Sequence, residues 1–201
     1  MLRVGLTGGL ATGKSFVGEA LEQLGCHLLK ADRLGHEVLL PGGEAFAAVV
    51  EEFGPDVLDA DGTINRRRLG QMAFGDPERL RKLNELVHPP VIAREEAWLH
   101  QVEALDAEAI AVVEAAILIE TGSYRRFDRL VLTVCREEQQ IERAMKRDQL
   151  TREQVEERLR RQMPLAEKRR FAHYVVDTSG EKEQTLEQVR GLYRALRQID
   201  L

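Results

Sequence analysis

The segment Gly8-Gly9-Leu10-Ala11-Thr12-Gly13-Lys14-Ser15 matches the pattern G-x-x-x-x-G-K-[ST]. An apolar run, Leu2 to Thr7, precedes it, and residues 15–24 follow with apolar side chains at helical spacing. Glycines allow successive backbone N–H groups to curl around an anion, and the N-terminus of the following helix adds partial positive charge. The segment therefore predicts a strand, loop and helix that bind the phosphates of a nucleoside triphosphate.

The last two residues of the motif carry the expected chemistry. We expect the Lys14 ammonium to bridge the β- and γ-phosphates during catalysis and the Ser15 hydroxyl to coordinate Mg²⁺. A glycine-rich turn without a ligand is the alternative, but strand, loop, Lys-Ser pair and helix all coincide here. The predicted ATP-binding residues are Gly8, Gly9, Leu10, Ala11, Thr12, Gly13, Lys14, Ser15 and Phe16.

Length and composition restrict the class of protein. With 201 residues, 43% hydrophobic residues and a net charge of −5, the chain predicts a folded domain and not a protein that coats nucleic acid. Cys26 and Cys135 lack the spacing of a disulfide framework or a zinc site, and no apolar run is long enough to cross a membrane. We therefore expect a cytoplasmic protein with neither a nucleic-acid nor a membrane partner. The oligomeric state is not predicted.

Apolar runs separated by helical patterns predict an α/β fold. We expect strands at residues 2–7, 26–32, 109–119, 130–134 and 174–176, forming a five-stranded parallel sheet flanked by helices in a single domain over residues 1–201. The long interval between the second and third strands predicts a helical insert, residues 37–107. Its expected helices are Glu44–Phe53, Arg66–Phe74, Pro77–Val87 and Pro90–Val102.

A second long interval, residues 136–172, predicts a helical lid. Thr151-Arg-Glu-Gln154 has the form of a capping box, so two helices should meet near residues 148–150. Arg143 and Arg147 lie four residues apart and could converge on phosphates at closure. A solvated helix face is the alternative for such a run of charges.

Asp32 is the candidate general base. It is expected to end the second strand, beside the strand that leads into the phosphate loop, at the sheet edge where ligands bind in α/β folds, and so to meet an acceptor hydroxyl. Capping of a helix that starts near Arg33 is its alternative role. The chain has neither the N-K-x-D segment of guanine switches nor the signature loop of transporter ATPases, which favours phosphoryl transfer.

Several further segments resemble the dephospho-coenzyme A kinase family. The phosphate loop from Gly5 to Ser15 is similar to the family's loop, and later pieces follow in the family's order. These pieces are Ala31-Asp32 with His36, Pro41-Gly42, Asp61-Gly62 through Arg66, His88-Pro89, Gln140-Ile-Glu-Arg143 with Arg147-Asp148, Arg161-Gln162, and Val176-Asp177 before Ser179-Gly180. Lys30, His173 and Thr178 depart from the family's usual residues.

The resemblance implies a P-loop nucleoside-triphosphate-binding fold and Mg²⁺-dependent transfer of the ATP γ-phosphate to the ribose 3′-hydroxyl of dephospho-coenzyme A, the last step of coenzyme A biosynthesis. It implies that the insert holds the acceptor and that Asp32 is the base, with Arg143 or Arg147 on the phosphoryl group. The implied substrate-binding residues are His36, Arg66, His88, Arg161 and Gln162. Two alternatives stay open: a kinase for another nucleotide-like acceptor, and a nucleotide-binding regulator or ATPase without an acceptor.

Overall fold

A computed structural model describes residues 1–199, apart from the Phe74 side chain. The chain forms two compact units. The first contains residues 1–30 and the chain from Leu99 onward, and the second contains Ala31–Trp98. None of the helices within the described residues has the length and apolar character needed to cross a bilayer.

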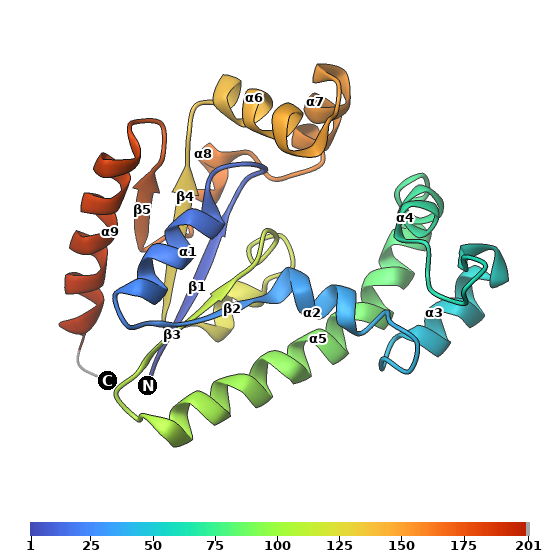
Figure 1. Cartoon of the computed structure of the whole chain (residues 1–201), viewed down its shortest axis with the longest axis horizontal. Coiled ribbons are helices and arrows are strands. Elements are labelled where there is room, and N and C mark those ends of the chain that lie inside the picture. The colour runs from blue at the N-terminus through green and yellow to red at the C-terminus, as the bar shows by residue number, and fades with distance from the viewer. Residues whose placement is uncertain (200–201) are drawn as a thin grey trace. The chain divides into compact units, whose positions relative to one another are not determined.

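The first unit is built on a parallel sheet (Figure 1). Its strands are β1 (Leu2–Gly8), β2 (His27–Lys30), β3 (Ile110–Glu114), β4 (Arg129–Val134) and β5 (Tyr174–Asp177), in the order β2-β3-β1-β4-β5. All four neighbouring pairs run parallel, so the predicted five-stranded parallel sheet is confirmed. Strands β3 and β4 flank β1, which places the segment after β1 at the middle of the sheet edge.

Two predicted strands are shorter than expected. Strand β2 ends at Lys30, and Asp32 lies in the first turn of the following helix, so the prediction that Asp32 ends the strand is wrong. Strand β3 ends at Glu114 and not at residue 119. Its apolar continuation leaves the sheet in a turn, where the Thr121 N–H donates to the Ile117 carbonyl. Apolar residues in that turn are also buried, so the apolar run in the sequence extends beyond the end of the strand.

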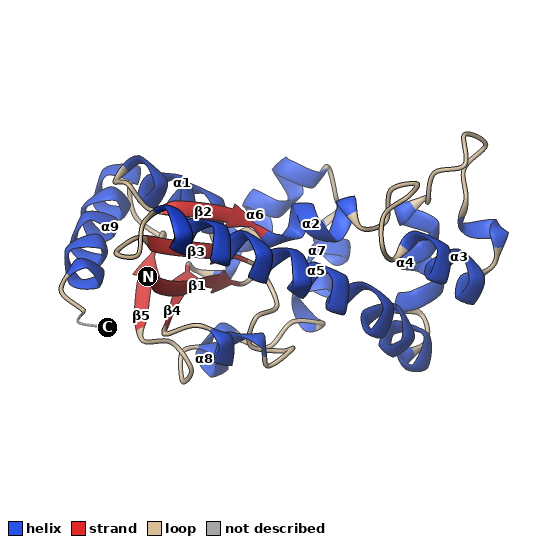
Figure 2. Cartoon of the chain, turned by 90° about the horizontal axis from the view of Figure 1, so that it is seen from below, coloured by secondary structure: helices blue, strands red, loops and turns tan. Residues whose placement is uncertain are grey.

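Helices α1 (Lys14–Gln23) and α9 (Lys182–Arg197) lie side by side over one face of the sheet (Figures 1 and 2). The apolar faces of these helices pack in one core with Val4 and the other inward-facing strand residues. The helix residues in this core include Val17 and Leu21 on α1 and Val189 and Leu196 on α9. On the opposite face, Leu118 and Phe127 pack close to Gly5. Burial on both faces explains the nearly continuous apolar character of these strands.

The segment between β4 and β5 is helical, with α6 (Glu137–Asp148), α7 (Arg152–Arg160) and the short α8 (Leu165–Lys168). Gln149 adopts a left-handed conformation with φ of 54° and ends α6. The Thr151 and Gln154 side chains form the predicted capping box at the start of α7. A 3₁₀ turn, η2 (Ser123–Arg126), precedes β4.

The second unit is helical and has its own core. It contains α2 (Ala31–Glu37), α3 (Phe46–Phe53), the 3₁₀ turn η1 (Pro55–Val57), α4 (Arg66–Phe74) and most of α5 (Pro77–Leu105). Buried Val49, Phe53 and Leu69 lie at the centre of this core. The Arg94 guanidinium joins α5 to the preceding segments through Glu44, at 2.8 and 2.9 Å, and Glu37, at 2.9 Å.

The prediction that one helix ends at Val87 and the next begins at Pro90 is wrong, because α5 continues through Pro89 and Pro90. A proline inside a helix removes a backbone hydrogen bond and normally favours a break. Here Leu83, Val87 and Val91, on both sides of the pair, pack against the same core. Tertiary packing therefore outweighs the local preference of the prolines.

Candidate active site

Residues 9–13 form a tight loop between β1 and α1 whose shape is imposed by close contacts. A Cβ on Gly8 would lie 2.2 Å from Thr133 Oγ1, so only glycine fits at that position. Ala11 and Gly13 are left-handed, with φ of 54° and 82°. The Thr12 hydroxyl lies 2.9 Å from the Gly9 carbonyl oxygen and 2.8 Å from the Thr133 hydroxyl, and Thr12 is buried. These contacts and backbone conformations give the loop the shape that the motif predicts.

Lys14 lies over this loop. Its ammonium donates to the carbonyl oxygen of Gly9 at 3.0 Å and to that of Gly8 at 3.4 Å. These two hydrogen bonds place the positive charge of the lysine next to an anion-binding loop at a helix N-terminus. This geometry suits the role of a cation that contacts the outer phosphates.

The carboxylate of Glu114, at the end of β3, lies beside the loop. The Ser15 hydroxyl donates to Glu114 Oε1 at 2.7 Å, and Glu114 is buried. Its other oxygen, Oε2, is buried without a hydrogen-bond partner within the described part of the chain. A buried hydrogen-bond acceptor without a partner costs free energy, so binding of a ligand to this oxygen is favoured.

The donor set fits Mg²⁺, which prefers hard oxygen ligands and usually binds through one or two protein groups plus phosphates and water. Among the described residues, no group of three or more His, Cys, Asp or Glu side chains could hold a metal ion. Our reading of the sequence nominated Ser15 but missed Glu114. The signal was available, because Glu114 is the one charged residue before Glu120 in the apolar run that starts at Ala109.

Arg143 is tied to the phosphate loop through Thr178. Its guanidinium donates to the Thr178 hydroxyl at 3.1 Å and to the Thr178 carbonyl at 2.8 Å. The same hydroxyl donates to the Thr12 carbonyl at 2.9 Å, and Thr178 is buried. Arg143 therefore reaches the base of the loop from α6.

Arg147, four residues later, has a different partner. Its guanidinium forms a two-pronged ion pair with Asp148, at 2.7 and 2.9 Å. Hydrogen bonding within this pair raises the pKa of Arg147 and lowers the pKa of Asp148. Arg143 and Arg147 thus contact different protein groups, and their convergence on phosphates stays a prediction.

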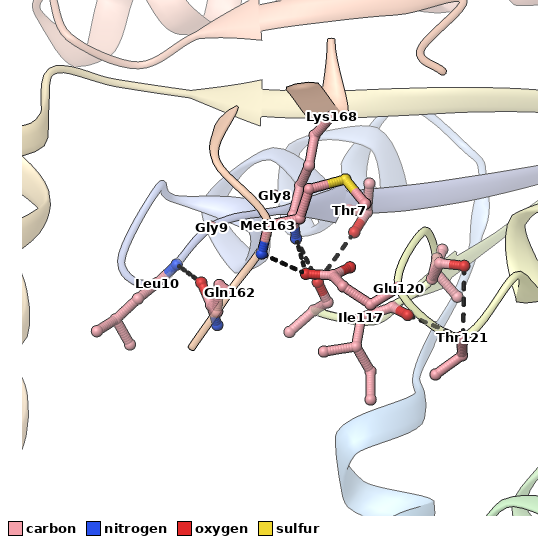
Figure 3. Close-up of polar contacts among 12 residues, drawn as sticks. Thr7, Gly8, Gly9, Leu10, Ile117, Glu120, Thr121, Gln162, Met163 and Lys168 are labelled. Atoms are coloured by element: carbon pink, nitrogen blue, oxygen red, sulfur yellow. Dashed lines mark hydrogen bonds and ion pairs between the residues drawn. The ribbon is translucent and has the colours of Figure 1, made fainter. Parts of the chain in front are cut away.

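Gln162 contacts the phosphate loop, because its Oε1 accepts the Leu10 N–H at 2.8 Å (Figure 3). The neighbouring Arg161 forms an ion pair with Glu157. The structure shows Gln162 bonded to the backbone of the loop, and its role in binding the acceptor stays a prediction. Gln140, which we had not singled out as a site residue, donates from Nε2 to the Leu10 carbonyl at 2.7 Å.

Asp32 and three of the residues expected to bind the acceptor, His36, Arg66 and His88, lie in the second unit, whereas Arg161 and Gln162 lie in the first. Asp32 and His36 are exposed on α2, and Arg66 is exposed at the start of α4. Partial burial lowers the pKa of His36, the charge of Arg66 lowers it further, and Asp32 opposes both. The structure thus places the charges of Arg66 and Asp32 close enough to His36 to act on its pKa.

His88, on α5, is half-buried, and burial lowers the pKa of its ring. It lines a surface pocket of about 440 Å³ together with Arg81, Asn84 and Glu85. A histidine whose pKa lies below its ordinary value is largely neutral at neutral pH, so it offers one N–H donor and one acceptor. That chemistry suits a polar, uncharged part of a ligand.

One expectation about Asp32 needs correction. Strand β2, which precedes Asp32 in the chain, does not lie beside β1, the strand that leads into the phosphate loop, because β3 separates them. The carboxylate on the neighbouring strand is Glu114. Lys30, two residues before Asp32, is the register partner of Glu114 on β3.

The three departures from the family pattern have local partners. Lys30 donates to Glu19 on α1 at 2.7 Å. His173 Nδ1 accepts the Leu130 N–H at 2.9 Å, which extends the β4–β5 edge. Thr178 supports the phosphate loop, as described above.

The comparisons with known proteins agree with one another. The family model described as dephospho-CoA kinase matches residues 2–184. Dephospho-CoA kinase from Aquifex aeolicus is 37% identical over 98% of both chains, and that from Geobacter metallireducens is 39% identical over 96% of both. The crystal structure of TT1252 from Thermus thermophilus superposes with a TM-score of 0.83 at 30% identity, covering 96% of each chain. The chain belongs to the dephospho-CoA kinase family and has its P-loop kinase fold.

Proposed function

We propose that this kinase transfers the γ-phosphoryl group of ATP to the ribose 3′-hydroxyl of dephospho-coenzyme A. The observation that carries the proposal is the phosphate loop with Lys14 over it and the Ser15–Glu114 pair beside it, in a chain of this family. The loop accounts for the donor, and the family accounts for the acceptor.

The donor side is supported by the geometry of the first unit. The loop amides and the α1 N-terminus would hold the phosphates, with Lys14 following the charge that moves from the γ-phosphoryl group to the leaving ADP. Ser15 and Glu114 would hold Mg²⁺, which when bound neutralises charge on the phosphate oxygens. Arg143 is placed to act on the same loop from the lid.

On the acceptor side, we assign Asp32 as the general base. Its carboxylate would accept the proton of the 3′-hydroxyl as that oxygen bonds to the γ-phosphorus and the bond to the β-phosphate bridging oxygen breaks. The exposure of Asp32, and the opposite effects of the Asp32 and Arg66 charges on the pKa of His36, support a polar, accessible site in the second unit. Arg66 and His88 would bind the acceptor, with residues 37–107 as the acceptor insert.

The lid assignment covers residues 136–172. The contact of Gln162 with Leu10 suggests that this segment senses the nucleotide more directly than the acceptor. Arg147 and Arg161 form ion pairs with carboxylates. In this proposal both guanidiniums leave these carboxylates and bind phosphates. We also propose a cytoplasmic location, which is consistent with two buried cysteines that remain free thiols.

An acceptor panel tests the proposal. The purified protein is supplied with Mg-ATP and either dephospho-coenzyme A, AMP or shikimate, and ADP release is followed in a coupled assay. We expect rapid ADP release with dephospho-coenzyme A alone, and none above background for Lys14→Ala. Preference for AMP would support the alternative of another nucleotide-like acceptor, and ADP release indifferent to any acceptor would support an ATPase.

A further inference from the structure

Lys168, on the four-residue helix α8, is a buried cation outside the site described so far. Its side chain has no exposed surface. The ammonium donates to the Ala116 carbonyl at 3.1 Å and pairs with Glu120 Oε1 at 2.7 Å. Burying an ammonium is costly unless it is paired and hydrogen-bonded, so these contacts fix one arrangement of α8 against the segment after β3.

Both partners of Lys168 are connected to the phosphate loop by further hydrogen bonds (Figure 3). The Ala116 carbonyl also accepts the hydroxyl of Thr7 at 3.2 Å, and Thr7 immediately precedes Gly8. Glu120 Oε1 also accepts the Met163 N–H at 3.3 Å. Met163 follows Gln162, so the ion pair holds the residue next to the one that contacts Leu10.

Both peptide groups that include Leu10 backbone atoms are hydrogen-bonded to glutamine side chains. Gln162 accepts the Leu10 N–H at 2.8 Å, and Gln140 donates to the Leu10 carbonyl at 2.7 Å. A Cβ on Gly9 would lie 2.6 Å from Gln140 Nε2, so the loop and these two amides are closely packed. The peptide that enters the left-handed turn at Ala11 therefore cannot rotate without breaking a bond to the lid.

We propose that Lys168 is a positioning residue for the phosphate-binding loop. With Glu120 it fixes residues 162–164, and through Gln162 it holds the Leu10 peptide in the orientation that lets the following amides face a triphosphate. Order that exists before binding lowers the entropy cost of binding, so the network raises nucleotide affinity. Lys168 itself is too buried to touch substrate. The inference rests on the proposed function in one respect only, which is the identity of the nucleotide that the loop binds.

The test compares nucleotide binding in variants that keep the packing. Lys168→Met combined with Glu120→Gln removes both charges together, so that no buried charge is left unpaired. Gln162→Leu removes the acceptor for the Leu10 N–H at a half-buried position, which keeps the test available if the double variant does not fold. Lys182→Met makes the same change at an exposed position and is the control.

ADP affinity is measured by calorimetry, and KM for ATP and kcat are measured with dephospho-coenzyme A. We expect ADP binding and KM each to worsen by about tenfold in the double variant and in Gln162→Leu, with kcat changing by less than about threefold. Because both changes act through one contact, the triple variant should bind ADP about as well as the double variant. The control should match the parent protein.

A purely structural role for Lys168 predicts a different result. The folded variants would then bind ADP within about twofold of the parent, or the two effects would add in full in the triple variant, and either outcome overturns the proposal. ADP binding does not require the acceptor. A parent protein that binds ADP but does not phosphorylate dephospho-coenzyme A would refute the proposed function and leave this inference testable.

Discussion

The Glu114→Gln variant should separate metal binding from folding. Glu114 accepts the Ser15 hydroxyl at 2.7 Å, and its second oxygen is buried without a partner among the described residues. Glutamine keeps the size of the side chain and an oxygen for Ser15 while it removes the negative charge. An unpaired buried oxygen costs about 1–3 kcal/mol, so replacing it with a neutral amide should change the free energy of unfolding by no more than about 1 kcal/mol.

The effect on Mg²⁺ should be much larger. Loss of a group that orients or binds a metal weakens affinity by about 10–100-fold, and the upper value corresponds to about 2.7 kcal/mol. We therefore expect Glu114→Gln to need about 100-fold more Mg²⁺ for half-maximal activity, with an unchanged urea midpoint. Activity is titrated with Mg²⁺ at constant free ATP, alongside Glu187→Gln, which makes the same change on the exposed surface of α9.

Two results would refute the reasoning. A Mg²⁺ titration identical to that of the parent would show that the Glu114 carboxylate is not at the metal site. A large fall in the free energy of unfolding, with no change in Mg²⁺ dependence among folded molecules, would show that Glu114 serves the core and not the reaction.

Three further predictions follow from other residues. Asp32→Asn should lower kcat by at least about 100-fold while ADP affinity measured by calorimetry stays near that of the parent, and near-normal turnover would reject the base assignment. Arg143→Ala, which breaks two bonds to Thr178, should lower the free energy of unfolding by about 1–3 kcal/mol as well as the rate, and a change in rate alone would mean that Arg143 acts on phosphate only. Burial raises the pKa of the Cys26 thiol from 9.0 to about 12, so its contribution to stability is complete below about pH 9 and is lost between about pH 9 and pH 12 at up to about 1.4 kcal/mol per pH unit. Urea unfolding from about pH 8 to about pH 11 should therefore show a shallower decline for Cys26→Ala than for the parent, and equal slopes would contradict the assignment.

The sheet and the loop were predictable because their signals are local. The glycines, Lys14 and Ser15 lie in one continuous segment, and burial on both sheet faces gives each strand an apolar run. The capping box at Thr151 was visible for the same reason, since its two partners lie three residues apart.

What the sequence did not reveal depends on contacts between distant segments. Pro89 and Pro90 indicated a break, and only the shared core of the second unit explains why α5 continues. The sheet order that puts Glu114, and not Asp32, beside β1 comes from how the crossovers return to the sheet, which apolar runs do not encode.

The segment between β4 and β5 shows the same limit in its side chains. Arg143 and Arg147 lie four residues apart on one helix, yet the first pairs with Thr178 and the second with Asp148. Spacing along a helix gives the face of a side chain, but the partner depends on the residues that the rest of the fold brings to that face. The contact between Gln162 and Leu10, which are 152 positions apart, is of this kind.

The most direct measurement is the structure of the product. The protein is incubated with Mg-ATP and dephospho-coenzyme A, and the purified product is examined by ³¹P NMR with proton coupling. The account predicts one new phosphomonoester on the ribose 3′ carbon for each ADP formed. A phosphoryl group on any other oxygen, or ADP that accumulates with inorganic phosphate while dephospho-coenzyme A stays unmodified, would contradict it.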